Sequence, residues 1–534
     1  MDSGTNVVIT GFMGTGKTAV GRKVAQLLGR SFVDMDEEIR TRAGRSIPDI
    51  FAEDGESAFR EMEAALCKEL SARRGLVIAT GGGTLVDPAK RERMVSSGTV
   101  ICLNCSIDEI ARRVGRNPHR PLLNVADPRA EIERLLAKRH AAYAAIPWQI
   151  EAGGLSIDEV AARVVEIAGA DTLTVCYPNG TYPIRIGDGL LSHLGGALRA
   201  SGIVEDTCVA VVSNTVVGPL YSQRVAESLR AASLKPFSCL LPDGEKHKRL
   251  AVVADLYDRF LEHGLDRTGV VVVLGGGVTG DVAGFAAATY MRGVRLVQVP
   301  TTLLAMVDAS VGGKTGVDLP QGKNLVGAFH QPLLVVIDPS VLAALPAEEM
   351  RCGLAEVIKH GLIGDPNLFT ELEREAGDAE LALWWGQDAV GRIARALRVK
   401  IGVVEEDPFE KGRRAVLNLG HTVGHGLERL SEFRIRHGDA VSIGMVAAAR
   451  IAVELDRAGQ SLVERIEAVL TAWKLPIRCP PLDAEMIWSA MTHDKKRRGD
   501  ALRWVLPLTI GTVETVEDVP PPLVKSVLRS LGAR

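Results

Sequence analysis

One complete phosphate-binding motif stands near the start of the chain. The stretch from Gly11 to Thr18 reads Gly-Phe-Met-Gly-Thr-Gly-Lys-Thr and fits the pattern G-x-x-x-x-G-K-[ST]. Its glycines let backbone N–H groups converge on a phosphate at the start of a helix, where the helix dipole favours negative charge. We expect Lys17 to hold the β- and γ-phosphates of a nucleotide and Thr18 to hold Mg²⁺. The motif alone leaves open whether the phosphate is transferred, hydrolysed or sensed.

Other polar residues in the same segment suit an anionic acceptor. Asp34 and Asp36 stand two positions apart just after an apolar run, so both carboxylates can face one crevice. Arg60 and Arg139 lie in helical patterns, and each one taken singly could be a solvated charge on a helix face. Together, these cations indicate a substrate that carries a negative charge.

A second glycine-rich loop follows an apolar strand in the middle of the chain. The stretch Gly275–Gly284 contains G-x-G-x-x-G, as a dinucleotide site does. No acid stands about 20 residues on, at 297–300, so an ordinary Rossmann site is not supported, although diphosphate binding on the loop is. Between Arg292 and Asn324, basic side chains then stand beside glycines, at Arg292-Gly293, Gly313-Lys314 and Gly322-Lys323. They suit a small anionic ligand or, alternatively, form a solvated basic loop.

The last third of the chain holds candidate metal ligands. His421 and His425 are four residues apart and would lie one above the other on a helix face, and His437 follows. With the carboxylate of Glu356, two imidazoles would make the ligand set of a catalytic zinc with an open position. Because His360 is also four residues from Glu356, spacing alone leaves His360 as a competing ligand.

Composition excludes several classes of protein. Lys plus Arg number 63 and Asp plus Glu 66 in 534 residues, and aromatic residues are 4%, which does not favour a nucleic-acid-binding protein. Eight cysteines are too few for a disulfide framework in such a chain. The pair Cys102 and Cys105 could be a redox pair or half a zinc site, but without a second CxxC we interpret the two as small apolar residues in and just after a buried strand. With neither a signal sequence nor an apolar run of about 20 residues, we expect a soluble, cytoplasmic protein with no membrane partner.

The order of elements predicts three α/β or helical domains that would position these residues. Strand and helix patterns alternate over 6–169, which predicts a parallel sheet with helices on both faces. A second α/β pattern follows, and after Pro346 long helical patterns dominate, which predicts an all-α domain. We therefore divide the chain into residues 1–170, 171–345 and 346–534.

Residues 5–169 resemble shikimate kinase, a kinase with the P-loop NTPase fold. The resemblance rests on the phosphate loop and on the motifs Asp34-Met-Asp36, Gly55-Glu-Ser-Ala-Phe-Arg60, Thr80-Gly-Gly-Gly83 and Arg120-Pro-Leu-Leu123. It implies transfer of phosphate from ATP to the 3-hydroxyl of shikimate, with Asp36 as the base and Glu63 orienting Arg60. Arg120 would belong to a lid over residues 112–124 and reach the transferred phosphate.

This resemblance assigns the remaining kinase residues. The implied ATP-binding residues are Gly14, Thr15, Gly16, Lys17, Thr18, Ala19, Arg113 and Arg120. The implied shikimate-binding residues are Asp36, Arg60, Gly81, Gly82, Gly83 and Arg139. Thr18 and Asp34 would hold Mg²⁺, and Lys17, Asp36 and Arg120 would be catalytic.

Residues 175–515 resemble 3-dehydroquinate synthase. The motifs that carry this resemblance are Gly275-Gly-Gly-Val-Thr-Gly-Asp281, Arg292-Gly, 300–308, Gly312-Gly-Lys314, Gly322-Lys-Asn324, Ala355-Glu-Val-Ile-Lys359 and 418–425. It implies that Glu356, His421 and His437 bind Zn²⁺ (or Co²⁺), with His360 as a bystander. Asp439 departs from the family's usual glutamate, and which of Lys495 and Lys496 contacts the substrate stays open.

The same resemblance assigns the cofactor and substrate residues. The implied NAD-binding residues are Asn214, Glu245, Lys248, Gly276, Gly277, Val278, Asp281, Thr301, Thr302, Lys314 and Lys323. The implied substrate residues are Arg292, Asp308, Lys314, Lys323, Asn324, Lys359, Lys400, Arg414, Asn418 and His425. Of these, Lys314, Lys359 and His425 would be catalytic.

The two resemblances together predict a bifunctional enzyme. The second half would convert 3-deoxy-arabino-heptulosonate 7-phosphate to 3-dehydroquinate and phosphate, using NAD⁺ that is reduced and then regenerated. One alternative is that the second half is another sugar phosphate cyclase, and a second is that the first half senses a nucleotide without phosphorylating anything. Since synthases of this type are commonly dimers, the resemblance also implies a homodimer formed through the second half.

Overall fold

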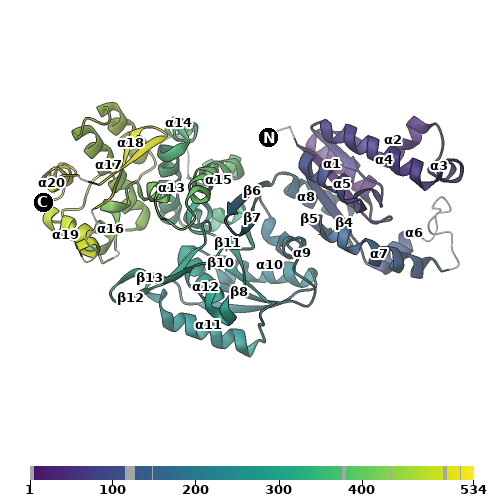
Figure 1. Cartoon of the computed structure of the whole chain (residues 1–534), viewed down its shortest axis with the longest axis horizontal. Coiled ribbons are helices and arrows are strands. Elements are labelled where there is room, and N and C mark those ends of the chain that lie inside the picture. Colours follow the sequence, from purple (N-terminus) through teal and green to yellow (C-terminus); the bar gives the residue numbers. More distant parts are fainter. Residues whose placement is uncertain are drawn as a thin grey trace. The chain divides into compact units, whose positions relative to one another are not determined.

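The computed structural model describes residues 5–114, 127–146, 148–375, 381–432, 434–496, 502–517 and 519–534 (Figure 1). The chain forms two compact units. The first comprises Met1–Ala170, Gly187–Thr207 and Arg224–Pro236, and the second comprises Asp171–Ile186, Cys208–Gln223 and Phe237–Arg534. In the described part of the chain, no helix is long and apolar enough to cross a membrane.

A parallel sheet of five strands organises the first unit. Its strands are β1 (Asn6–Gly11), β2 (Ser31–Asp34), β3 (Leu76–Ala79), β4 (Gly98–Asn104) and β5 (Trp148–Glu151), in the spatial order β2-β3-β1-β4-β5. Every neighbouring pair is parallel, as the alternation of strands and helices predicts. All residues of the central strand β1 are buried, which is typical of a strand covered by helices on both faces.

Eight helices precede Asp171 in the described part of this unit. They are α1 (Lys17–Leu28), α2 (Met35–Ala43), α3 (Ile47–Glu53), α4 (Gly55–Ala72), α5 (Pro88–Ser97), α6 (Ile107–Val114), α7 (Pro128–Ala144) and α8 (Ile157–Ala168). Val8 and Ile78 of the sheet share one apolar core with Met35 of α2 and Leu66 of α4. Cys102 lies buried in β4 within this core, as we interpreted it from the sequence. One apolar core therefore holds the strands and helices together, and the polar loops begin where the strands of this sheet end.

A second sheet, of seven strands, begins after α8. Its strands are β6 (Asp171–Tyr177), β7 (Gly180–Ile186), β8 (Cys208–Asn214), β9 (Lys235–Leu241), β10 (Val270–Gly275), β11 (Arg295–Pro300) and β14 (Leu334–Ile337), in the spatial order β6-β7-β14-β11-β10-β8-β9. From β7 to β8 the neighbouring strands are parallel, and β6 is antiparallel to β7. The helices of this region are α9 (Leu194–Ala200), α10 (Gly218–Ala231), α11 (Leu250–Glu262) and α12 (Gly277–Thr289).

Between β11 and β14 the chain leaves the sheet. A π-helical turn over Ala305–Ala309 carries Asp308. An antiparallel hairpin follows, formed by β12 (Lys314–Leu319) and β13 (Gly322–Phe329). π-Helical turns are uncommon and are found mostly at functional sites. The turn therefore indicates that this segment, which also carries several predicted substrate-binding cations, belongs to a functional site.

The C-terminal region is helical, as predicted, with one addition. Its helices are α13 (Ala347–Gly364), α14 (Pro366–Glu375), α15 (Leu381–Glu406), α16 (His421–Leu430), α17 (His437–Glu454), α18 (Gln460–Ala472), α19 (Ala484–Lys496) and α20 (Pro521–Ser530). The addition is an antiparallel hairpin, β15 (Trp504–Thr509) and β16 (Thr512–Val516), which the expectation of an all-α domain did not include. The region is thus mainly helical rather than purely so.

Glycines let α16 and α17 approach each other closely. A Cβ atom on Gly444 would lie 1.8 Å from the carbonyl oxygen of Gly420, and one on Gly424 would lie 3.2 Å from the backbone of Ala440. Gly420, the N-cap of α16, has a φ angle of 80°. The backbones of the two helices are therefore in contact, which fixes the position of the histidine-bearing face of α16 against the start of α17.

We expect Gly444→Ala to lower the free energy of unfolding of the second unit by about 1–3 kcal/mol, because the methyl group forces the two backbones apart. The matched control is Gly402→Ala in α15, where a Cβ atom meets nothing within 4 Å. That change should be neutral or should stabilise by about 0.5–1 kcal/mol, through helix propensity. Calorimetric unfolding of the full chain measures both effects, and equal stabilities for the two variants would contradict the close approach of the helices.

Candidate active sites

The loop between β1 and α1 has the backbone that a phosphate-binding motif requires. Gly14 and Gly16 have φ angles of 84° and 94°, which are left-handed values that favour glycine. Gly16 is the N-cap of α1, so the N–H groups of the first helical turn face the loop. Lys17 Nζ donates a hydrogen bond of 2.9 Å to the carbonyl oxygen of Phe12. Its ammonium therefore lies inside the loop, where phosphate oxygens could replace that carbonyl.

The structure brings the two predicted Mg²⁺ ligands together. Thr18 Oγ1 donates a hydrogen bond of 2.6 Å to Asp34 Oδ2. The other carboxylate oxygen of Asp34 caps α2 by accepting from the backbone N–H groups of Asp36 and Glu37, at 3.0 and 3.2 Å. One oxygen is thus held by the helix and the other faces the phosphate loop. A hydroxyl and a carboxylate oxygen are ligands that Mg²⁺ prefers.

The glycine triplet after β3 lies against the predicted acceptor residues. A Cβ atom on Gly81 would stand 2.6 Å from Asp36 Oδ1. A Cβ atom on Gly83 would stand 3.1 Å from Arg60 Nη1, and one on Gly82 would stand 3.2 Å from the backbone nitrogen of Met13. The triplet therefore lies against the phosphate loop, Asp36 and Arg60, and its lack of side chains leaves room beside them for an acceptor molecule.

Arg60 is held by a buried carboxylate. Glu63 is 1% exposed, and it accepts hydrogen bonds of 2.6 Å from both Arg60 Nη1 and Thr84 Oγ1. Lys90 Nζ lies 3.6 Å from the same carboxylate and donates to the carbonyl oxygen of Arg60 at 3.2 Å. Sequence reasoning identified Glu63 but missed Thr84 and Lys90, because no local spacing connects them to Arg60. The group leaves the guanidinium oriented and still partly exposed.

Arg139 and Arg113 flank the phosphate loop. Arg139 Nη1 donates to the carbonyl oxygen of Gly82 at 3.3 Å, and its guanidinium carbon lies 5.6 Å from the ring centroid of Phe12. Tyr143, one turn along α7 and missed from the sequence, donates its hydroxyl to the same carbonyl. Arg113 Nη1 donates to the carbonyl oxygen of Gly14 at 3.4 Å. Arg120 and most of the predicted lid lie outside the described residues.

In the second unit, three candidate metal ligands meet. Glu356 of α13, His421 of α16 and His437 of α17 offer ligand atoms that all lie within 4.8 Å of one another. The Nε2 atoms of His421 and His437 are 3.7 and 3.5 Å from Glu356 Oε1. The Glu356 side chain is fully buried. Two imidazoles and a carboxylate at these separations fit a catalytic zinc ion or a similar transition metal.

The second nitrogen of each imidazole fixes its orientation. His421 Nδ1 is 3.2 Å from the carbonyl oxygen of Leu419, so Nδ1 carries the proton and donates it. His437 Nδ1 is 3.5 Å from Glu428 Oε1, a carboxylate that sequence reasoning missed. Both Nε2 atoms are therefore directed to Glu356. Orientation of this kind is what a ligated histidine needs.

The charges around the cluster suit metal binding. Burial lowers the pKa of His421 well below its ordinary value, aided by the ammonium of Lys359, so the imidazole is neutral. Burial acts to raise the pKa of Glu356, but the Lys359 ammonium and the histidines hold it well below its usual range. Burial acts to lower the pKa of His437, but the carboxylates of Glu356 and Glu428 raise it to about 10. In the absence of metal, the cluster thus holds a proton that a bound cation would displace.

A second group of possible ligands shares Glu356. Asp308, Glu356 and His360 also offer ligand atoms within 4.8 Å of one another, so the ambiguity about His360 has a structural basis. Lys400 Nζ donates to the backbone oxygen of Asp308 at 2.6 Å and is also paired with its carboxylate. Burial lowers the pKa of His360 to about 4. Because Asp308 already has a cationic partner, we consider this group the weaker metal site.

Several predicted substrate residues form ion pairs and close backbone contacts. Lys359 is paired with Glu356, and Lys314 Nζ is 2.6 Å from Glu410 Oε2. Arg414 donates to the carbonyl oxygen of Gly312 at 3.3 Å, and a Cβ atom on Gly312 would lie 2.3 Å from its guanidinium. Glu410 is a partner that sequence reasoning did not identify. In the structure it has a left-handed φ angle of 57°.

The other predicted substrate residues lie beside the metal ligand His421 in the sequence or have left-handed backbone angles. Asn418 ends the turn before α16, and His425 lies one turn after His421, with ring centroids 5.2 Å apart. Arg292 and Asn324 have left-handed φ angles of 67° and 54°. Strained backbone of this kind tends to cluster at functional sites. The side chains of Lys495 and Lys496 lie outside the described part of the chain.

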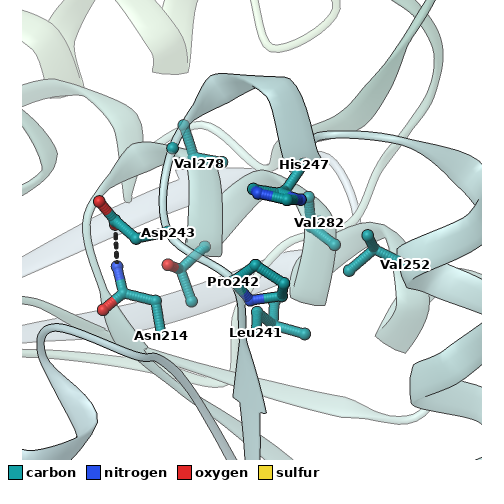
Figure 2. Close-up of a pocket in the computed structure, with 10 residues that line it drawn as sticks. Asn214, Leu241, Pro242, Asp243, His247, Val252, Val278 and Val282 are labelled. Carbon is teal, nitrogen blue, oxygen red and sulfur yellow. Dashed lines mark hydrogen bonds between the residues drawn. The ribbon is translucent and has the colours of Figure 1, made fainter.

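A pocket lies where β8 and β9 end, beside the start of α12 (Figure 2). Asn214 Nδ2 donates to Asp243 Oδ1 at 2.7 Å on one wall, as Figure 2 shows, and Val278 at the start of α12 lies on another. The remaining lining residues are Leu241, Pro242, Gly244, His247, Val252, Thr279 and Val282. The carboxyl ends of neighbouring parallel strands are where α/β sheets bind nucleotides, so the pocket suits the adenosine part of a dinucleotide.

The other predicted NAD residues adjoin this pocket and the second glycine-rich loop. Lys248 is paired with Asp281 of α12, and Lys323 Nζ lies 3.0 Å from Glu245 Oε1. The loop is close to the residues after β11. The backbone N–H of Thr301 donates to the carbonyl oxygen of Gly275 at 3.0 Å, and a Cβ atom on Gly276 would lie 3.1 Å from Thr302. Glycine therefore leaves room at the N-terminus of α12 for a diphosphate.

Known proteins match both halves of the chain. The family model described as shikimate kinase matches residues 13–168. The models for the N-terminal and C-terminal parts of 3-dehydroquinate synthase match residues 238–352 and 353–497. A 3-dehydroquinate synthase of Microcystis aeruginosa is 45% identical over 357 residues, which are 67% of this chain and 97% of the relative.

Solved structures match the second half. A 2-epi-5-epi-valiolone synthase from Streptomyces hygroscopicus subsp. jinggangensis, with NAD⁺ and Zn²⁺ bound, is 28% identical with a TM-score of 0.61 and covers 67% of this chain and 98% of its own. A 2-deoxy-scyllo-inosose synthase, complexed with carbaglucose-6-phosphate, NAD⁺ and Co²⁺, is 27% identical with a TM-score of 0.62 and covers 67% and 99%.

Proposed function

Because the chain belongs to the shikimate kinase family in its first part and to the 3-dehydroquinate synthase family in its second, we propose two specific reactions for this bifunctional enzyme. The first is the phosphorylation of shikimate by MgATP. The second is the conversion of 3-deoxy-arabino-heptulosonate 7-phosphate to 3-dehydroquinate and phosphate, with NAD⁺ and Zn²⁺ or Co²⁺. Both reactions belong to the biosynthesis of aromatic amino acids.

For the kinase, the observation that carries the proposal is the contact between Thr18 and Asp34 beside the Lys17 loop. The loop and Lys17 would hold the phosphates, and Thr18 and Asp34 would hold Mg²⁺. Arg60 would bind the carboxylate of shikimate so that a hydroxyl faces Asp36, whose carboxylate accepts the proton. Phosphoryl transfer depends mainly on such positioning and on neutralisation of charge.

For the synthase, the observation that carries the proposal is the convergence of Glu356, His421 and His437. When bound, Zn²⁺ would polarise a substrate hydroxyl as a Lewis acid, and NAD⁺ would take up and return a hydride. Burial lowers the pKa of His425, so its ring is neutral and can accept a proton. Lys359, Lys400 and the other cations would neutralise the carboxylate and the phosphate of the substrate.

Among the relatives, the identities favour 3-dehydroquinate synthase over another sugar phosphate cyclase. The dehydroquinate synthase relative is 45% identical, whereas the valiolone and inosose synthases are 28% and 27% identical. All of these share the fold, so the fold by itself does not select a substrate. The kinase part supports the same choice, because shikimate chemistry then occurs twice in one chain.

Assays with each substrate test the proposal. Adding shikimate to the purified chain and MgATP should raise ADP formation far above the background without shikimate, since Asp36 and Arg60 provide an acceptor site. Adding the heptulosonate 7-phosphate with NAD⁺ and Zn²⁺ should release phosphate and form 3-dehydroquinate. ADP formation that does not respond to shikimate would favour the nucleotide sensor, and no phosphate release would favour a different cyclase.

We also propose three properties that follow from family membership. The domains span residues 1–170, 171–345 and 346–534, a division supported by the start of β6 at Asp171 and of α13 at Ala347. The chain forms a homodimer through its synthase part. The protein works in the cytoplasm, where the free thiols of its cysteines would stay reduced. Gel filtration with light scattering tests the dimer, and a monomer at micromolar concentration would contradict it.

A further inference from the structure

Glu428 is a buried carboxylate to which neither sequence motif gives a role. It lies in α16, seven residues after His421 and three after His425, so all three side chains share one helix face. Its side chain is 8% exposed. A carboxylate buried to this extent needs a partner to offset the loss of hydration. The partners of Glu428 therefore indicate what it does.

Glu428 has two nitrogen partners, the imidazole of His437 and the ammonium of Lys323. Its Oε1 atom lies 3.5 Å from His437 Nδ1, the ring nitrogen that faces away from Glu356. The same oxygen lies 3.9 Å from Lys323 Nζ, whose closer partner is Glu245 at 3.0 Å. The imidazole of His437 thus lies between two carboxylates, with Nε2 directed to Glu356 and Nδ1 to Glu428. The contact with Lys323 is longer and is shared.

We propose that Glu428 is a positioning residue for the metal centre: its carboxylate holds the proton on His437 Nδ1, so that Nε2 is the ligand atom. This inference rests on the proposed metal site. A histidine ligand that lacks such a partner can rotate, or bind a proton on the ligating nitrogen. Outer partners of ligating histidines typically contribute about 10- to 100-fold to metal affinity. Glu428 would not contact the metal or the substrate.

The test is the affinity of the full chain for Co²⁺ alone, without NAD⁺ or substrate, after the native metal has been removed with a chelator. The visible absorption of bound Co²⁺ reports occupancy and coordination, and competition with a chelator gives the Kd. We expect Glu428→Ala to raise the Kd about 10- to 100-fold. Glu428→Gln, whose amide oxygen can still accept the Nδ1 proton, should have a smaller effect and guards against misfolding of the alanine variant.

Two control variants separate this role from its alternatives. Lys323→Ala removes the other partner of Glu428 and should leave the Co²⁺ Kd within about threefold of wild type, since Lys323 Nζ lies 3.9 Å from Glu428 and closer, at 3.0 Å, to Glu245. An equal loss in Lys323→Ala and Glu428→Ala would overturn the direct role of Glu428. An unchanged Kd in Glu428→Ala would also overturn it.

The proposed function can fail separately. His421→Ala removes a predicted ligand and should abolish specific Co²⁺ binding. If wild type binds Co²⁺ and His421→Ala does not, the metal site stands, and the result for Glu428→Ala decides the positioning role alone. If wild type and His421→Ala bind Co²⁺ equally well, the proposed site is wrong and the role of Glu428 falls with it.

Discussion

Lys17→Ala is expected to lower shikimate-dependent ADP formation by at least about 10²- to 10³-fold, the usual cost of removing a group that stabilises charge in a transition state. The ammonium of Lys17 lies inside the loop, 2.9 Å from the carbonyl oxygen of Phe12. Lys17 is the single lysine of the motif, so no other residue of the motif can supply that charge. Alanine at this position keeps the helix, because it is the best helix former. The loss should therefore be chemical rather than structural.

The control is Lys23→Ala, which removes a lysine from the same helix. Lys23 Nζ lies 2.7 Å from Asp158 Oδ1, with Asp158 exposed and Lys23 partly exposed, so the pair should contribute at most about 1 kcal/mol. The kinase rate of Lys23→Ala should therefore stay within about twofold of wild type, because the lost interaction energy is small. A coupled assay for ADP with and without shikimate measures both variants. Kinase activity that survives in Lys17→Ala would contradict the role of the loop.

The same variant tests whether the two activities are independent. Dehydroquinate formation does not precede shikimate phosphorylation directly, because other steps separate the two, so no product needs to pass from one site to the other. We therefore expect Lys17→Ala to leave dehydroquinate formation unchanged. A parallel loss of both activities in this variant would contradict independent sites.

Local motifs made most of the fold and part of each site predictable. Within one strand or helix, a short spacing in the sequence fixes how the side chains lie relative to one another. Such spacings define the loop at Gly11, the pair Asp34 and Asp36, and the i, i+4 histidines of α16. Strand ends were less predictable. The apolar run from Val100 to Leu103 is shorter than β4 (Gly98–Asn104), because pairing with β1 extends the strand at its start and pairing with β5 extends it at its end.

The missed residues have a common physical cause. Lys90 meets Glu63 across 27 positions of sequence, and Glu410 meets Lys314 across 96, so only the tertiary fold brings them together. Their charges are typical of exposed residues, which gives no local signal. The hairpin of β15 and β16 was missed for a different reason. Pro507 within β15 argues against a central strand, but a two-stranded hairpin has free edges that tolerate proline.

His421→Ala is expected to reduce metal occupancy to below about a tenth of wild type and dehydroquinate formation by more than about 100-fold, because losing a ligand should exceed the cost of losing an outer partner. Glu356 and His437 would remain, and two ligands hold zinc weakly. The kinase rate should not change, since Lys17 and its loop belong to the other unit. Metal analysis of the purified chain and the two activity assays measure these effects.

The matched control, His360→Gln, decides which histidine binds the metal. His360 is as buried as Glu356 and shares a possible ligand group with it, so the spacing of residues cannot exclude it. The charges favour His421, because Asp308, the carboxylate that only the His360 group contains, is paired with Lys400. Replacing His360 should thus leave metal occupancy near wild type, although packing around the buried side chain would suffer. Loss of metal in His360→Gln but not in His421→Ala would reverse the assignment and place the metal beside Asp308.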